Sequence, residues 1–306
     1  MSNPASENDP QPTPSGLPAA LGAYTIWGLL PLYLILVNSV PPFEFVGWRI
    51  IWTLPFCLII VAFRKQFGEV LSALKDRKIL LTLVVSATLI GINWFAYVWA
   101  VQTGHVYAAS LGYYINPLLN VLLGTLILGE KLSKRQWVAV GFAASGVAIL
   151  AAGALTTLWI SLTLAFSFGT YGLLRKQVAV GALPGLTIES TLLLLPSTLV
   201  VLYYAGLPAG SSFTIDIPFS MIIMLGGVVT AVPLLLFSVA TKRMNYSTLG
   251  FVQFLAPTIV FLLGLFVFKE ELKPVQLACF ILIWTALAIF VCDMWSRRES
   301  REPHKA

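Results

Sequence analysis

The feature that most constrains this chain is a stretch of about 33 residues that occurs twice. The first copy is HVYAASLGYYINPLLNVLLGTLILGEKLSKRQW (105–137), and the second is NYSTLGFVQFLAPTIVFLLGLFVFKEELKPVQL (245–277). At a constant offset of about 140 residues, five identities align without a gap: Pro117 with Pro257, Gly124 with Gly264, Glu130 with Glu270, Leu132 with Leu272, and Gln136 with Gln276. A repeat of about half the chain indicates a duplicated architecture.

The composition identifies the solvent in which the chain folds. Hydrophobic residues make up 58 % of the chain and charged residues only 10 %, whereas a soluble domain carries about a quarter charged residues. Apolar runs of about 18 residues or more recur, and each can cross the roughly 30 Å core of a bilayer as a helix. A helix satisfies its own backbone hydrogen bonds in hydrocarbon. The sequence therefore predicts an all-α polytopic membrane protein.

The apolar runs predict ten transmembrane helices, five in each half. The first five cover 20–38, 43–63, 79–101, 106–128 and 135–152, and the last five cover 156–175, 184–205, 217–241, 246–268 and 274–294. The predicted division is a disordered cytoplasmic tail (1–19), a first repeat (20–153), a second repeat (154–294) and a basic cytoplasmic tail (295–306). The first tail is rich in proline and polar residues, a composition typical of disorder. It lacks a basic start, so the first helix is expected to be an uncleaved anchor.

Basic residues predict the orientation. With the amino terminus in the cytoplasm, sixteen of the eighteen Lys and Arg residues that lie in loops, in tails or at span ends are on the cytoplasmic side, and only Lys269 and Lys273 lie outside. The positive-inside rule favours this arrangement, so the formal charge of +6 reflects topology rather than nucleic-acid binding. Both termini are expected in the cytoplasm. Because each half has an odd number of spans, the halves enter the membrane in opposite directions, as two inverted five-helix repeats.

Inverted repeats favour a function. They are typical of secondary transporters, whose substrate site lies near the membrane midplane between the repeats. We therefore expect a permease that moves a small organic molecule by alternating access. Two other classes stay open. One is a non-transporting membrane scaffold or receptor, and the other is a channel, although no ring of repeated charges or filter-like loop is visible.

The first copy of the repeat carries a polar stripe. Asn116 and Asn120 lie one helical turn apart, in one row with Gly112 and Gly124. Two interpretations compete for the amides: a cavity wall that binds substrate, and a contact between helices. Pro117 lies between the asparagines, and a proline bends a helix and frees the carbonyl four residues back. The proline favours the cavity wall.

The second copy keeps only part of this pattern. It has Gln253, Pro257 and Gly264 in the stripe, but Ala256 and Val260 stand where the first copy has asparagines. We infer that proline and glycine serve the shared backbone shape, whereas the amides serve one side of the cavity. Pro117 and Pro257 are therefore the predicted hinges.

Aromatic and amide side chains on other spans complete a candidate pocket. A single aromatic residue is typically a packing or interfacial residue. Together, however, indole and phenol faces with a few amides suit a planar or amphipathic organic molecule better than a bare ion. The candidate substrate-binding residues are Tyr24, Trp27, Asn93, Trp94, Tyr97, Tyr113, Asn116, Asn120, Tyr171 and Gln253.

Two ionisable residues lie inside spans, Arg49 and Glu189, and they too are about 140 residues apart. An ionisable group in the membrane is a functional hypothesis by default, so both are candidates for coupling transport to an ion. Glu189 also lies near enough to the cytoplasmic end to extend into water. The inverted repeats are expected to turn the two residues toward opposite ends of the cavity. Glu44 lies five residues from Arg49, a poor spacing for a direct contact.

Two further features have a structural interpretation. Glu130 and Glu270 each precede a span, where a carboxylate can cap the amino terminus of the helix that follows. Ala144, Ala148 and Ala152 form a row of small residues, which indicates tight helix packing or a contact between copies of the chain.

Enzymatic signals are absent from the sequence. It contains no H-E-x-x-H, no G-x-S-x-G and no glycine-rich phosphate loop. Cys57, Cys279 and Cys292 lie in or at the end of apolar spans, and they fit neither a metal site nor a disulfide framework. We expect no enzyme, no metal, no cofactor and no nucleic-acid partner. The expected partners are a small-molecule substrate, the lipid bilayer and other copies of the chain in a homo-oligomer.

Ten spans, two inverted repeats and the segments SLGYYINPL and LGEKLS resemble the EamA family of the drug/metabolite transporter superfamily. The first segment is most similar to the RarD branch, known as chloramphenicol-sensitive protein. The resemblance covers residues 18–294. It implies a permease of the bacterial inner membrane that moves a metabolite, amino acid or drug, often as an exporter. The second copy departs from the motif at Ala256 and Val260, so no site residues are assigned there.

Overall fold

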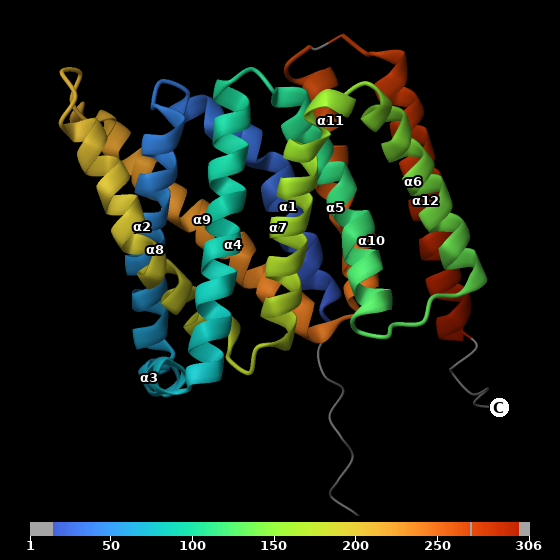
Figure 1. Ribbon diagram of the computed structural model, residues 1–306, viewed down its shortest axis with the longest axis horizontal. Helices are drawn as coiled ribbons and strands as arrows, with labels where there is room; N and C mark the ends of the chain where they lie inside the picture. The colour runs from blue at the N-terminus through green and yellow to red at the C-terminus, as the bar shows by residue number, and fades with distance from the viewer. Residues whose placement is uncertain (1–14, 270, 300–306) are drawn as a thin grey trace, which may run out of the picture.

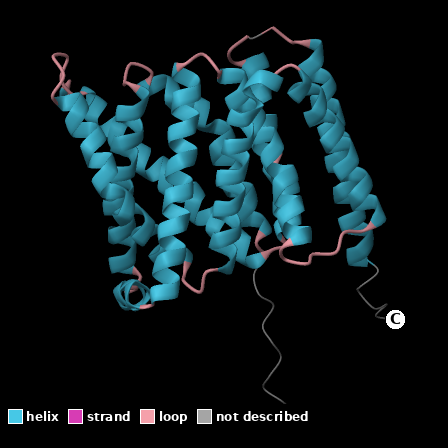
Figure 2. Ribbon diagram, viewed as in Figure 1, coloured by secondary structure: helices cyan, strands magenta, loops and turns pink. Residues whose placement is uncertain are grey.

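The computed structural model describes residues 15–269 and 271–299, which form helices joined by short loops, with no strand in these ranges (Figure 1, Figure 2). Ten helical segments in this part of the chain are long and apolar enough to cross a membrane. The predicted all-α polytopic fold is therefore confirmed. α1 (Leu17–Leu34) begins and α12 (Pro274–Glu299) ends at the same face of the bundle (Figure 1). We call this face the terminal face, and the opposite one the far face.

The remaining spans alternate in direction between the two faces (Figure 1). In the first half the helices are α2 (Pro42–Phe63), α3 (Phe67–Lys75), α4 (Arg77–Gln102), α5 (Val106–Leu126) and α6 (Lys134–Ala152). In the second half they are α7 (Leu158–Gln177), α8 (Ala182–Ala205), α9 (Ile217–Arg243), α10 (Tyr246–Gln253) and α11 (Leu255–Phe266). α10 and α11 together form one span, and the short α3 lies at the terminal face (Figure 1). Short 3₁₀ turns cover Ile35–Val37, Leu155–Thr157 and Ser212–Thr214. The spans agree with the prediction to within a few residues, because prolines, charges and polar caps mark their ends.

Three details differ from the sequence analysis. α1 begins at Leu17, so residues 17–19 of the expected tail are helical, and residues 1–14 and 300–306 lie outside the described part. α3 occupies a segment expected to be a loop and lies at the terminal face (Figure 1). The ninth expected span is divided into α10 and α11 at Phe254, one turn before Pro257. A proline removes an intrahelical hydrogen bond at that position, but α5 continues unbroken through Pro117.

The two halves of the chain interlock. α2 packs against α8 and α9, and α7 packs against α4 and α5, so each half supplies a helix to the other's core. α6 and α12, which are equivalent in the two repeats, lie side by side at one end of the bundle (Figure 1). α6 buries Ala139, Ala143 and Gly146, whereas the row that begins at Ala144 is exposed. The expected homo-oligomer contact through that row stays a prediction.

Opposite directions of equivalent helices are consistent with the inverted repeat. α5 runs from the far face to the terminal face, and its equivalent, α10 with α11, runs the other way (Figure 1). At the terminal face the second half of α5 therefore meets α10, and at the far face the first half of α5 and the end of α11 line one cavity. This crossing of equivalent helices positions the candidate site.

Candidate functional site

At the terminal face, α5 and α10 cross in close contact. Gly250 of α10 allows the approach, since a Cβ there would lie 2.6 Å from the carbonyl oxygen of Pro117. The side-chain N–H of Asn120 donates to Gln253 Oε1 at 2.6 Å, and the hydroxyl of Tyr24 reaches the same oxygen at 3.5 Å. All three side chains are buried. The crossing is therefore closed by packing and by a polar link between the two halves.

Glu130 adds a second link at this face. Its carboxylate accepts hydrogen bonds from the backbone N–H groups of Tyr246 (2.6 Å) and Ser247 (2.8 Å), at the amino terminus of α10. Unpaired N–H groups and the helix dipole favour a negative charge there. The prediction that Glu130 caps the helix that follows it was wrong, because Ser133 and Gln136 cap α6 with their own capping box. Glu270, its equivalent, lies outside the described residues.

At the far face, the equivalent parts of the repeat are apart. A cavity of about 440 Å³ is lined by Tyr107 and Ser110 of α5 and by Val260 and Gly264 of α11. Shifted by about 140 residues, these four correspond to Ser247, Gly250, Asn120 and Gly124, which meet at the terminal face. The amino terminus of α5 has no side-chain cap of its own, since His105 makes no capping hydrogen bond. The same residue positions are thus closed at one face and open at the other.

An aromatic group lies beside the closed crossing. Trp27 packs on Tyr24 of its own helix, on Phe168 of α7 and on Phe237 of α9, with ring centroids 5.6–5.8 Å apart. Tyr171 stacks on Phe237 at 6.2 Å. Tyr24, Tyr171 and Phe237 are buried. We call Tyr24, Trp27, Phe168, Tyr171 and Phe237 the aromatic plug, because these rings fill the space between α1, α7 and α9.

A second group surrounds Arg49 in the half of the bundle nearer the far face. Its guanidinium carbon lies 4.7 Å from the ring centroid of Trp94, a cation–π geometry. The rings of Tyr97 and Tyr113 lie 5.7 Å apart in the same neighbourhood. Tyr33 is close by, since a Cβ at Gly226 would lie 3.0 Å from its hydroxyl and 3.3 Å from Arg49 Cβ. Tyr113 keeps 41 % of its surface exposed. We call Arg49 and these four aromatic residues the arginine site.

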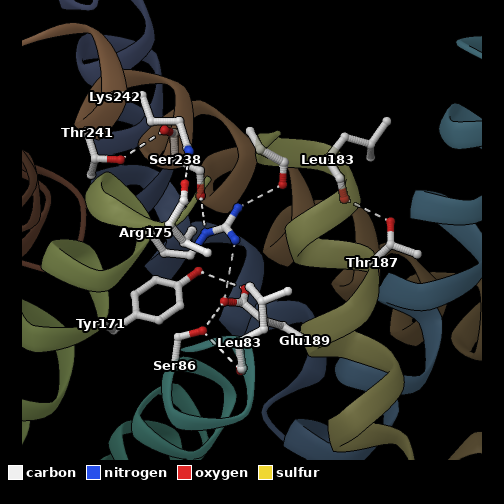
Figure 3. Close-up of polar contacts among 12 residues, drawn as sticks. Leu83, Ser86, Tyr171, Arg175, Leu183, Thr187, Glu189, Ser238, Thr241 and Lys242 are labelled. Atoms are coloured by element: carbon white, nitrogen blue, oxygen red, sulfur yellow. Dashed lines mark hydrogen bonds and ion pairs between the residues drawn. The ribbon is translucent and has the colours of Figure 1, made fainter. Parts of the chain in front are cut away.

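A buried charge network lies nearer the terminal face. Arg175 at the end of α7 pairs with Glu189 of α8 at 3.7 Å, and both side chains are almost completely buried (Figure 3). Arg175 also donates to Ser238 Oγ at 3.3 Å and to the carbonyl of Ala182 at 2.9 Å. Ser86 and Tyr171 donate to the Glu189 carboxylate. The network therefore joins α4, α7, α8 and α9, and Glu189 does not extend into water.

The cavity beside the Glu189 carboxylate is small. A cavity of about 10 Å³ is lined by Glu189, Tyr171, Trp94 and Ser190, which is space for about one water molecule. Gly185 of α8 faces the guanidinium of Arg175, and a Cβ at Gly185 would overlap it. The network is therefore closely fitted around the ion pair.

The two remaining amides have different surroundings. Asn93 of α4 donates to the carbonyl of Leu164 at 2.9 Å and to Ser167 Oγ at 3.0 Å, which ties α4 to α7. Asn116 is buried, but its Oδ1 has no hydrogen-bond partner in the described part of the chain. Asn93 and Asn120 thus donate to neighbouring helices in this structure, whereas the side-chain oxygens of both Asn116 and Asn120 have no hydrogen-bond partner among the described residues.

The structure divides the predicted site residues between two places. Tyr24, Trp27, Asn120, Tyr171 and Gln253 gather at the plug and the closed crossing, and Trp94, Tyr97 and Tyr113 gather around Arg49. Asn93 and Asn116 lie buried on α4 and α5. Sequence analysis did not single out Tyr33, Ser86 or Arg175 as site residues. A pairing between spans depends on helix rotation, for which the sequence carried no signal.

Comparison with known proteins gives consistent results. Residues 14–152 match the model of the EamA-like transporter family. An uncharacterized transporter of Pseudomonas aeruginosa is 44 % identical, over 92 % of this chain and 94 % of the relative. Protein RarD of Salmonella typhimurium is 41 % identical, over 93 % and 97 %. A solved crystal structure superimposes with a TM-score of 0.69 at 18 % identity, over 90 % of this chain and 96 % of that chain, and shares the fold.

Proposed function

Because the chain belongs to the EamA-like transporter family, we propose that it is a secondary transporter that moves a small organic molecule by alternating access. It is a multi-pass membrane protein whose relatives are transporters. The substrate, the mechanism and the direction are our proposals. Neither a scaffold nor a receptor needs an aqueous path that opens alternately to the two sides of the membrane.

One observation carries the proposal: equivalent residues of the repeat are in contact at the terminal face and apart at the far face. Gly124 approaches Ser247 so closely that a Cβ on the glycine would lie 2.5 Å from the serine Oγ. The equivalent pair, Gly264 and Tyr107, lines the far-face cavity. Exchange of these two arrangements would close the far face and open the terminal face around a site between them. Alternating access requires such an exchange.

The substrate path follows from the same geometry. The far-face cavity of about 440 Å³ has the size of a small-molecule site, and the aromatic plug lies beside the closed crossing. We propose that the substrate lies between them, in contact with the predicted residues Tyr24, Trp27, Trp94, Tyr97, Tyr113, Asn116 and Gln253. Pro117 and Pro257 remain the predicted hinges. Coupling at Glu189 or Arg49 stays a prediction.

We assign the terminal face to the cytoplasm of a bacterium and the bilayer to its inner membrane. The segment between α2 and α4, at this face, carries Arg64, Lys65 and Lys75, as the positive-inside rule requires. In this orientation the structure is open to the outside. Export is the proposed direction, in line with the resemblance described above, and reporter fusions at both termini test the assignment.

Two matched cysteine pairs test alternating access. In a chain whose own cysteines are replaced, Gly124→Cys with Ser247→Cys should form a disulfide in the state seen here and hold the terminal face closed. Tyr107→Cys with Gly264→Cys occupies the equivalent positions and should form one only in the opposite state. Each disulfide should stop transport in liposomes, and reduction should restore it.

The outcomes separate the three classes. In a transporter each pair forms its disulfide, and in a chain that carries both pairs the terminal-face disulfide prevents the far-face disulfide. A scaffold or receptor forms only the terminal-face disulfide. If the far-face variant transports at the full rate and never forms its disulfide, alternating access is overturned. A channel conducts with either pair oxidised.

A further inference from the structure

We propose that the arginine site binds the carboxylate of a small organic anion with an aromatic body; this rests on the proposed transport function and names its substrate class. The inference begins with charge. Arg49 is half-buried in α2, and it makes no ion pair with any residue in the described ranges. Its Nε is buried without a hydrogen-bond partner. A cation inside the membrane that lacks a partner is rare and marks a substrate or ion path.

The nearest acidic candidate on the same helix is already occupied. Glu44 Oε1 accepts from Trp48 Nε1 at 3.2 Å, from the backbone N–H of Ser212 at 2.9 Å and from the hydroxyl of Ser211. Glu44 Oε2 accepts from the hydroxyl of Ser212 at 2.9 Å. These bonds tie α2 to the loop between α8 and α9. Glu44 therefore serves a structural contact at the far face and leaves Arg49 unpaired.

The equivalent position in the second repeat also carries a charge, but that charge has a partner within the protein. Arg49 corresponds to Glu189, which pairs with Arg175 and accepts hydrogen bonds from Ser86 and Tyr171. Within the described residues, the fold thus provides a protein partner for one of the two equivalent charges and none for the other. An unpaired guanidinium is the part of the site that needs an anion from outside the chain.

The surroundings of Arg49 match an aromatic carboxylate. A guanidinium presents N–H donors in a planar fork that fits the two oxygens of a carboxylate. Tyr97 of α4 and Tyr113 of α5, whose rings lie 5.7 Å apart, bring phenol groups to the same region. Tyr33 of α1 also lies close to Arg49, but its hydroxyl already donates to the carbonyl of Ile222 at 2.8 Å. The face of Trp94 already holds the cation, and the exposed ring of Tyr113 offers a surface for a second aromatic body. Inorganic anions would use the charge but not these rings.

The test uses indole-3-acetate and its neutral amide, indole-3-acetamide, as probes. Binding to the purified full-length protein is measured by calorimetry, which does not depend on transport. The native protein should bind the acid at least about tenfold more tightly than the amide, since the amide lacks the charge that Arg49 pairs with. Equal binding of the two, or binding of neither, overturns the proposal.

Variants assign the effect to the residue. Arg49→Gln should remove the preference for the acid while leaving binding of the amide unchanged, and Arg49→Lys should keep part of it. Arg64→Gln, at the exposed end of the same helix, is the matched control and should bind both probes as the native protein does. If Arg49→Gln does not insert, Tyr113→Phe, which removes only a hydroxyl group, should weaken binding of the acid alone.

The result can be separated from that of the cysteine pairs. Alternating disulfides without a preference for the acid would overturn the carboxylate site and leave the transport proposal standing. A preference for the acid that depends on Arg49, without alternating disulfides, would support an anion-binding receptor. Loss of the acid's advantage in Arg64→Gln would also contradict the assignment to Arg49.

Discussion

The two ends of the α5 crossing are built from equivalent residues but differ in chemistry. The terminal-face crossing is held by the hydrogen bond from Asn120 to Gln253 and by Glu130 on α10. The positions equivalent to Asn120 and Gln253 are Val260 and Tyr113, which cannot form the same amide pair. The far face must therefore close through other contacts. This difference favours the state seen here, with the terminal face closed.

The two equivalent charged residues inside the membrane, Glu189 and Arg49, also differ between the repeats. Glu189 has a partner in Arg175, whereas Arg49, at the equivalent position, has a tryptophan face and three phenols. One repeat thus uses its charge to hold helices together, and the other leaves its charge available. Duplication supplies the shared backbone, and substitution at a few positions gives the two halves different tasks.

The largest effect is expected from breaking the buried pair. Arg175→Met should lower the free energy of unfolding by about 3–5 kcal/mol, because Glu189 is then left buried without its cation. Arg49→Met should lower it by only about 0.5–1 kcal/mol, the value of a cation–π contact. Denaturant unfolding in detergent, monitored by circular dichroism, measures both. Equal losses would show that the two charges are not used differently.

A double variant provides the control. Arg175→Met with Glu189→Met removes both charges and should recover most of the stability, since no charge is left unpaired. A double variant as unstable as Arg175→Met alone would mean that packing around Gly185, rather than charge, determines the cost.

The next effect concerns the closed crossing. Gly250→Ala should cost about 1–3 kcal/mol, because its Cβ would press on the carbonyl of Pro117 and force α5 and α10 apart. Gly141→Ala on α6 meets nothing within 4 Å and is the matched control. Labelling of Ser247→Cys from the terminal face should rise in the first variant and not in the second. Unchanged labelling in both would mean that this crossing does not close the path.

A smaller effect is expected at the cap of α10. Glu130→Ala leaves two backbone N–H groups without their acceptor and should cost about 1 kcal/mol. The far-face disulfide between Tyr107→Cys and Gly264→Cys should then form faster, because the closed terminal face is weakened. Ser133→Ala, which removes the cap of α6, should cost a similar amount without changing the rate. Equal rates in both variants would show that Glu130 does not bias the two states.

The sequence predicted the ten spans because each is an apolar run bounded by charges, prolines or polar caps. α3 was missed, although Phe67, Leu71 and Leu74 have helical spacing between basic residues, because a nine-residue helix at the membrane surface looks like a charged loop. The break at Phe254 lies where Pro257 weakens the helix, but Pro117 causes no break. Packing against neighbouring helices decides whether a proline breaks its helix, and a single sequence does not reveal that packing.

The candidate site was predictable in its members but not in its arrangement. Aromatic and amide residues stand out in apolar spans, so Trp94, Tyr97 and Tyr113 could be selected from the sequence. Their gathering around Arg49, and the separate plug beside Tyr171, depend on how each helix is rotated. The repeat carried the most information, since it relates a contact at one face to an open position at the other.

The smallest expected effect distinguishes the two asparagines of the stripe. Asn120→Val copies the residue at the equivalent position and should cost about 0.6 kcal/mol, the average for a polar contact between membrane helices. Asn116→Ala should leave the melting temperature unchanged or raise it, because its Oδ1 is buried without a partner among the described residues. If Asn116 binds substrate, Asn116→Ala should weaken the affinity for a transported compound, by about tenfold for each 1.4 kcal/mol of binding free energy that is lost. Melting and binding are measured on the same purified samples. A lower melting temperature with intact binding in Asn116→Ala would assign this residue to helix packing, and the first repeat would then hold its substrate through Arg49 and the tyrosines alone.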